Sequence, residues 1–175
     1  MICKHYISPI IGAVLLGTIL LAPANAESIY QEPADFIAEV FGSDTPAPEA
    51  LWITDEIRSE ARNILGRDLR QLRIRYWHDD NRSAWILDEI GKDLPITTGI
   101  VIEAGTIKIV RVLVFRESRG WEVRFPFFTN QFFDVQLDEK NRLDQSIDNI
   151  SGATMSVNAL KRQARLALLL ETYID

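Results

Sequence analysis

The stretch TTGIVIEAGTIKIVRVLVF, residues 97–115, decides the fold. Two runs rich in Ile and Val flank residues 103–105 (EAG), which suit a tight turn, so the stretch predicts a β-hairpin. The second arm is apolar on both faces, at Val110 and over residues 112–115, which predicts a strand in the interior of a sheet. The hairpin is therefore the expected centre of a block of antiparallel strands.

Three further segments have the residue pattern of strands. Residues 72–77 (LRIRYW) alternate with a period of two, and residues 83–91 (SAWILDEIG) form a second candidate. Residues 120–125 (GWEVRF) are a third. Helices predicted before and after this block make the expected class α+β, with a small antiparallel sheet flanked by helices.

Two segments carry strong helix signals. In residues 54–66, Thr54 is a typical N-cap residue, two acids follow at the positive end of the helix dipole, and Gly66 suits the position after the last turn. Residues 156–174 contain no Gly or Pro and predict a long C-terminal helix. A short helical turn is expected around residues 34–41, followed by a linker. The expected buried residues are Ile57, Ala61, Ile64 and Leu65 in the first helix and Val157, Leu160, Ala164, Ala167 and Leu168 in the last.

The first 26 residues have the layout of a secretory signal peptide. Lys4 precedes an apolar run over residues 10–22, and the triplet Ala24-Asn25-Ala26 follows at the distance expected of a cleavage site. An uncleaved membrane anchor is the alternative, since the run approaches the roughly 20 residues that span a bilayer. Cleavage would leave a soluble protein, exported to the periplasm or beyond. The predicted organisation is a signal peptide at 1–26, an extension and linker at 27–53, and one binding domain at 54–175.

The composition of the chain excludes several classes of function. The formal net charge is −6, and loss of Lys4 with the signal peptide makes it −7, which argues against nucleic acid as a partner. Cys3 is the only cysteine, so the processed chain cannot use thiolate catalysis, disulfide exchange, an iron–sulfur cluster or cysteine-attached haem.

His78 is the one histidine that remains after loss of the signal peptide. It lies beside Asp79 and Asp80 in YWHDDNRS, which is more typical of a polar turn than of a metal site.

Residues 148–160 (DNISGATMSVNAL) place small residues against the start of the long helix. Gly152 allows the backbone to bend and a ligand to approach the main chain. The first turn of the helix offers unpaired N–H groups and a partial positive charge, which together form an anion site. The hydroxyls of Thr154 and Ser156 could face a phosphate, and Thr154 could be esterified by it. The alternative is that Ser151 or Thr154 only caps the helix.

The heptapeptide Asp148-Asn149-Ile150-Ser151-Gly152-Ala153-Thr154 resembles the D-x-x-S/T-G-A-T/S signature of FMN-binding domains. This family includes the flavin-carrying subunits of sodium-pumping NADH:quinone reductases and related ferredoxin oxidoreductases. The resemblance covers about residues 96–172, and it implies that Thr154 is esterified to the phosphate of FMN by a flavin transferase that uses FAD and magnesium. Residues 117–120 (ESRG) are similar to the family's E-T-P-G, with Arg119 in place of the proline. The cofactor-binding residues expected beside Thr154 are Asp148, Ser151, Gly152, Ala153 and Ser156.

Three more residues are candidates for contact with the flavin. Glu117 is expected at the end of the central strand, where polar groups can reach a ligand, although a solvated loop carboxylate fits the same position. Arg119 could approach the flavin phosphate or the reduced, anionic ring. Trp121 opens an aromatic-rich run that ends at residue 133, in which most rings are expected in the core and one or two at the flavin ring.

These features favour an exported electron carrier over a stand-alone enzyme. FMN on Thr154 would take electrons from one redox protein and pass them to another, and either partner could be membrane-bound. A flavin reductase that acts on a small acceptor is a variant, although the chain has no G-x-G-x-x-G nicotinamide fingerprint. The alternative class is a non-redox exported binding or accessory module whose motif is a capped helix start. No residue is expected to act in turnover, and no metal ligands are predicted.

Overall fold

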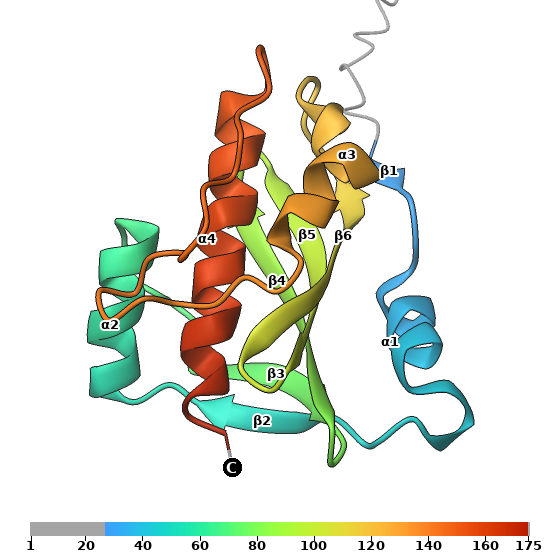
Figure 1. Ribbon diagram of the computed structural model, residues 1–175, viewed down its shortest axis with the longest axis vertical. Helices are drawn as coiled ribbons and strands as arrows, with labels where there is room; N and C mark the ends of the chain where they lie inside the picture. The colour runs from blue at the N-terminus through green and yellow to red at the C-terminus, as the bar shows by residue number, and fades with distance from the viewer. Residues whose placement is uncertain (1–26, 175) are drawn as a thin grey trace, which may run out of the picture.

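The computed structural model describes residues 27–174 as a six-stranded antiparallel sheet with helices on both faces (Figure 1). The predicted signal peptide, residues 1–26, lies outside the described residues. The strands follow the order β1-β6-β5-β4-β3-β2 across the sheet, and every neighbouring pair is antiparallel. The predicted α+β class is confirmed. The strands are β1 (Ser28–Ile29), β2 (Glu49–Trp52), β3 (Arg73–His78), β4 (Arg82–Ile90), β5 (Pro95–Glu103) and β6 (Thr106–Phe115).

The hairpin of β5 and β6 forms as predicted. Its turn contains Ala104 and Gly105, which take positive φ angles of 49° and 75°. β6 is an interior strand, as predicted, because β5 pairs with one of its edges and β1 with the other. β1 covers only the last two residues of β6. The opposite end of the same edge is closed by a loop, since the N–H of Ile107 donates to the carbonyl of Val135 (2.9 Å).

The segment predicted as an extension and linker supplies parts of this fold. Helix α1 (Pro33–Phe41) forms where the sequence predicts a helical turn, and it buries Phe36 against the sheet. This packing requires a glycine in β5, because a Cβ on Gly99 would lie 2.5 Å from the Phe36 ring. The linker is shorter than predicted, since residues 49–52 form β2 and pair with β3. Both edge strands therefore come from residues before position 54.

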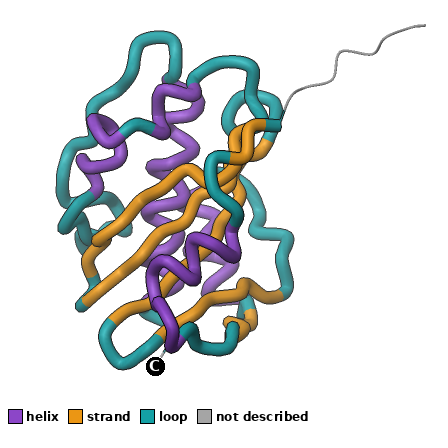
Figure 2. Tube along the Cα trace, turned by 90° about the vertical axis from the view of Figure 1, so that its right-hand side faces the viewer, coloured by secondary structure: helices purple, strands orange, loops and turns teal. Residues whose placement is uncertain are grey.

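Two longer helices cover the face of the sheet opposite α1, so the sheet is the middle of three layers (Figure 2). Helix α2 (Asp55–Leu65) has the predicted ends: Thr54 Oγ1 accepts a hydrogen bond from the N–H of Ile57 (3.3 Å), and Gly66 is left-handed. Helix α4 (Thr154–Glu171) packs against α2, β4 and β5. All nine apolar residues that the sequence predicts as the inner faces of these two helices are buried.

The segment 120–125, predicted as a strand, instead contains a 3₁₀ helix at residues 121–124. Gly120 has a left-handed backbone with a φ of 86°, which turns the chain after the end of β6, and Pro126 is favoured in the first turn of a helix. Phe128 and Phe132 are both buried and lie four residues apart, so helical spacing rather than alternation brings the apolar residues into the core. The elements here are η2 (Trp121–Arg124), α3 (Pro126–Thr129) and η3 (Asn130–Phe132), of which η2 and η3 are 3₁₀ helices.

Candidate functional site

Helix α4 begins inside the predicted motif, with Ala153 as its N-cap residue. Gly152 precedes it with a φ of 83°, a left-handed conformation that bends the chain into the helix. No side chain caps this helix start, so the alternative in which Ser151 or Thr154 caps α4 is wrong. The first intrahelical bond joins the N–H of Val157 to the carbonyl of Ala153 (2.9 Å). The N–H groups before it thus have no intrahelical partner and are available to an anion.

Thr154 is exposed, and one contact orients its hydroxyl. The side-chain amide of Asn149 donates to the threonine oxygen, with 3.0 Å between Nδ2 and Oγ1. Asn149 stands at a variable position of the signature, so sequence reasoning assigns it no role. The contact makes Oγ1 an acceptor, and this oxygen can keep the same hydrogen bond after it has lost its proton.

Glu117 is neither a free loop carboxylate nor a group aimed only at a ligand. Its Oε1 accepts hydrogen bonds from the backbone N–H groups of Lys92 (2.5 Å), Asp93 (2.6 Å) and Leu94 (2.8 Å). These three residues form the turn between β4 and β5, whereas Glu117 follows the end of β6. The carboxylate therefore holds two loops together and fixes the place of Lys92.

Gly120 brings the loop after β6 into contact with the start of α4. A Cβ at this position would lie 2.5 Å from Ser156 Oγ and 3.5 Å from Ala153 Cα. Ser156 is buried, so its hydroxyl lies against Gly120 rather than in open solvent. The two short sequences that resemble the family, residues 117–120 and 148–154, are about thirty residues apart in sequence and adjacent in space.

These segments line one cavity of about 570 Å³, a volume within the roughly 300–1,000 Å³ of ordinary ligand pockets. Six of the nine predicted cofactor-binding residues line it, and Lys92, Ser118 and Met155 join them. Lys92 is the functional candidate that sequence reasoning missed, because only the contact with Glu117 brings its turn to the motif. The predicted residues in the lining are Glu117, Arg119, Gly152, Ala153, Thr154 and Ser156.

The charges around this cavity favour an anion. Lys92 and Arg119 both line it, and both are exposed at its rim. Lys92 Nζ lies 3.4 Å from Asp93 Oδ2, which is a solvent-screened pair of two exposed side chains and adds little stability. The carboxylate of Glu117 is partly balanced by the three N–H groups that bind it. Two cations and the positive end of a helix dipole therefore meet at Thr154.

Three predicted residues do not line the cavity. Asp148 and Ser151 are exposed, and the N–H of Asp148 donates to the side chain of Gln131 (2.7 Å). Trp121 is 42% exposed and packs edge-to-face on Phe125, with 5.6 Å between the ring centroids. Of the six aromatic rings in this run, Phe128 and Phe132 are fully buried, as expected for core residues. None of the six, all within the described part of the chain, lines the cavity.

The region around His78 is occupied by local contacts. His78 Nε2 lies 2.9 Å from Glu49 Oε1, a contact that ties β3 to β2. Asp79 accepts hydrogen bonds from the N–H groups of Asn81 (2.8 Å) and Arg82 (2.9 Å), and these bonds lower the pKa of its carboxyl. In residues 27–174 no three His, Cys, Asp or Glu side chains are grouped to hold a metal ion.

Residues 91–169 match the model of the FMN-binding domain family. The matched region begins at the turn that carries Lys92 and extends through residues 117–120, the motif and most of α4. The resemblance predicted from the heptapeptide is thus confirmed. A comparison with the curated proteins found no match.

Proposed function

Because residues 91–169 match the FMN-binding domain family, we propose that the protein is an exported electron-transfer flavoprotein that carries FMN as a phosphoester on Thr154. One observation carries the proposal: an exposed threonine hydroxyl stands at an uncapped helix start in the wall of a ligand-sized cavity. When bound, FMN supplies the redox chemistry, and the protein sets its position and access. Different residues of this cavity fit the phosphate and the ring of the cofactor.

The phosphate fits the start of α4. The free N–H groups of the first turn can donate to phosphate oxygens, and Lys92 and Arg119 supply positive charge from two different loops. Asn149 keeps Oγ1 of Thr154 directed to the surface, where a transferase can reach it. Arg119 stands where the family has a proline, so this chain adds a cation to its own phosphate site.

The flavin ring of FMN fits the apolar rim of the same cavity. Met155 lines the cavity and is 48% exposed, and its thioether can pack against a flat aromatic ring. Trp121 follows Gly120 directly and also leaves much of its ring exposed, so it is the nearest aromatic candidate in sequence for a second contact. The buried Phe128 and Phe132 are excluded from this role because they lie in the core.

Attachment is a single maturation event. The flavin transferase would bond Thr154 Oγ1 to the phosphorus of the FMN half of FAD, with magnesium on the phosphates. The pyrophosphate link of FAD breaks, AMP leaves, and the transferase takes the hydroxyl proton. Thr154 has no part in later turnover, in which the carrier exchanges electrons with a donor protein and an acceptor protein.

Export rests on the N-terminal sequence, since Lys4, the apolar run and Ala24-Asn25-Ala26 form a signal-peptide pattern. None of the helices within residues 27–174 is both long and apolar enough to span a membrane. A covalent bond suits an exported carrier, because a dissociating cofactor would be diluted outside the cytoplasm and hard to replace.

One measurement tests attachment and export together. The full-length gene is expressed with a flavin transferase in a bacterial host, and the intact mass of the periplasmic protein is recorded. We expect the mass of residues 27–175 plus one FMN, and a yellow protein whose absorbance is bleached reversibly by dithionite. A host without the transferase should give the same chain without the added mass. Unmodified protein in both hosts would disprove attachment, and a mass that includes residues before Ala22 would disprove cleavage.

Gly152→Val is expected to lower flavin loading more than stability. The φ of 83° is unfavourable for any residue with a Cβ, by roughly 1–2 kcal/mol, and a valine there would project into the cavity beside Thr154. Gly105→Val is the matched control, since Gly105 has a φ of 75°, open space around it and a position in the β5–β6 turn. Both variants should lose similar thermal stability, and only Gly152→Val should lose most of its FMN. Equal FMN loading of the two variants would show that Gly152 has only a structural role.

A further inference from the structure

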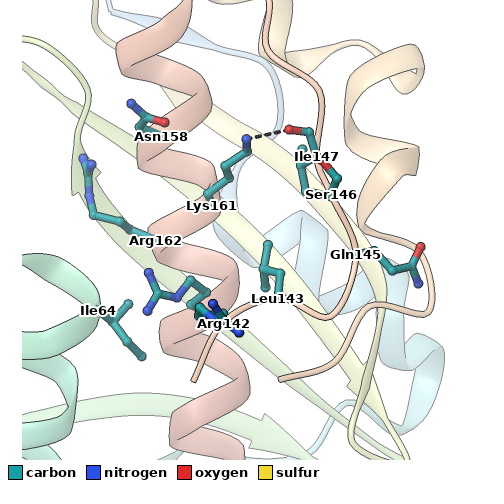
Figure 3. Close-up of a pocket in the computed structure, with 10 residues that line it drawn as sticks. Ile64, Arg142, Leu143, Gln145, Ser146, Ile147, Asn158, Lys161 and Arg162 are labelled. Atoms are coloured by element: carbon teal, nitrogen blue, oxygen red, sulfur yellow. Dashed lines mark hydrogen bonds between the residues drawn. The ribbon is translucent and has the colours of Figure 1, made fainter. Parts of the chain in front are cut away.

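A second cavity lies along the same helix, and four of its ten lining residues are cations (Figure 3). Its volume is about 460 Å³, and its walls are α4, the end of α2 and the loop residues 142, 143 and 145–147. Asn158, Lys161 and Arg165 line it and follow Thr154 by four, seven and eleven residues, so they share one stripe of the helix. Lys161 lies about 10 Å from Thr154 along the helix axis, at 1.5 Å per residue. We call this space the α4 cavity.

The α4 cavity has an excess of positive charge. It is lined by Arg142, Lys161, Arg162 and Arg165, and no carboxylate of the described residues is in its lining. Two of these cations have a carboxylate partner next to the cavity. Arg142 pairs with Asp138 (2.8 Å), and Arg162 pairs with the buried Glu89 (3.0 Å). Glu89 is shared, since Arg67 also binds it, so one negative charge serves two guanidinium groups.

Within residues 27–174, the other two cations hydrogen-bond only to backbone carbonyl groups. Lys161 Nζ donates to the carbonyl of Ile147 (2.5 Å), the contact drawn in Figure 3, and Arg165 Nε donates to the carbonyl of Asn141 (2.7 Å). An ammonium has three N–H donors and a guanidinium has five, so each residue keeps several donors for a ligand. Burial lowers the pKa of Arg165; Asp138 partly opposes this effect and Arg142 adds to it. The positive charge of Arg165 is therefore incompletely compensated by the protein.

We propose that the α4 cavity binds a phosphate-bearing small molecule of nucleotide size. Arginine forks bind phosphate oxygens in pairs, and three arginines and a lysine line this cavity in an otherwise acidic protein. Asn158 and Ser146 add neutral hydrogen-bonding groups beside the cations, and Ile64 and Leu143 give an apolar surface on which a base or another flat group can pack. The volume of the cavity lies within the roughly 300–1,000 Å³ of ordinary small-molecule pockets.

This site is separate from the flavin site proposed above. The two cavities have no lining residue in common, and Lys92, Arg119 and the N–H groups of the helix start serve only the first. Binding here therefore does not depend on FMN. A test in protein that cannot be flavinylated keeps the two proposals apart.

The experiment is calorimetric titration of Thr154→Ala protein with ADP and with inorganic pyrophosphate at low ionic strength. We expect saturable binding of at least one of the two probes, at one site per chain. Lys161→Gln combined with Arg165→Gln should weaken this binding at least tenfold, and Arg165→Lys, which keeps the charge but loses the fork, should have an intermediate effect. Arg75→Gln is the control for Arg165→Gln alone, because both remove one positive charge and Arg75 lies at an exposed position on β3 outside the cavity.

Each outcome decides the proposal. Tighter binding of ADP shows that the nucleoside contributes, and equal binding shows recognition of the phosphates alone; both support the site. Absence of saturable binding by both probes overturns the proposal. An equal loss in Arg75→Gln overturns it as well, since the attraction would then be diffuse. Saturable binding of polyglutamate with none of ADP or pyrophosphate would mean that the cavity docks an acidic protein instead. Circular dichroism melts check that every variant is folded.

Discussion

Thr154→Ala protein, made together with a flavin transferase, is expected to carry no FMN, whereas the wild-type chain gains the mass of one FMN. The loss should be complete, because the variant lacks the only hydroxyl that is exposed, lies at the helix start and is oriented by Asn149. Ser156 cannot replace it, since its hydroxyl is buried against Gly120. Fluorescence in a denaturing gel and the mass of the peptide that contains Met155 measure the effect.

Two further variants test whether attachment requires the hydroxyl at position 154. Thr154→Ser keeps the hydroxyl and should still be loaded. Ser156→Ala removes the neighbouring hydroxyl and should also be loaded, because the attachment oxygen remains. The fold of Thr154→Ala should be unchanged, since the residue is exposed and loses one surface hydrogen bond. FMN that persists in Thr154→Ala would show that attachment at this residue is wrong.

Gly120→Val is expected to lose both stability and flavin, with the largest effect on stability among the variants considered. A left-handed residue with a Cβ costs roughly 1–2 kcal/mol, and β-branched residues are rare at such angles. The new Cβ would also lie 2.5 Å from Ser156 Oγ and 3.3 Å from Ser156 Cβ, and overpacking of this kind typically costs about 1–3 kcal/mol. The start of α4 must move to relieve the contact, so the cavity at Thr154 should lose its shape.

Urea unfolding measures the loss of stability in Gly120→Val, and flavin content measures the loss of bound FMN. Gly42→Val is the control, since Gly42 has a φ of 67° and no atoms within 4 Å of its Cβ position, so it experiences the strain without the clash. It should be destabilised less and fully loaded. Gly120→Ala together with Ser156→Ala should recover part of the loading lost in Gly120→Ala alone. If Gly120→Val and Gly42→Val behave alike, the contact between the loop and α4 has no functional role.

The elements whose signals are local were predictable from the sequence. The hairpin turn at Ala104 and Gly105, the capped helix α2 and the apolar stripe of α4 each depend on residues a few positions apart. The motif at Thr154 is equally short, but the expectation of FMN came from its resemblance to the signature of FMN-binding domains, which the family match supports. In each case backbone conformation and side-chain spacing act within one element, so the pattern and its physical cause lie in the same short stretch.

Tertiary structure alone decided how these elements form a site. Glu117 looks like an isolated acid in sequence, yet its carboxylate binds three N–H groups more than twenty residues away and brings Lys92 to the motif. Gly120 is read in sequence as the first residue of a strand, and its contact with Ser156 shows why it must be a glycine. The α4 cavity likewise combines Arg142 from a loop with Lys161 and Arg165 from the helix. Such contacts depend on the distance between segments after folding, which composition, periodicity and local spacing do not encode.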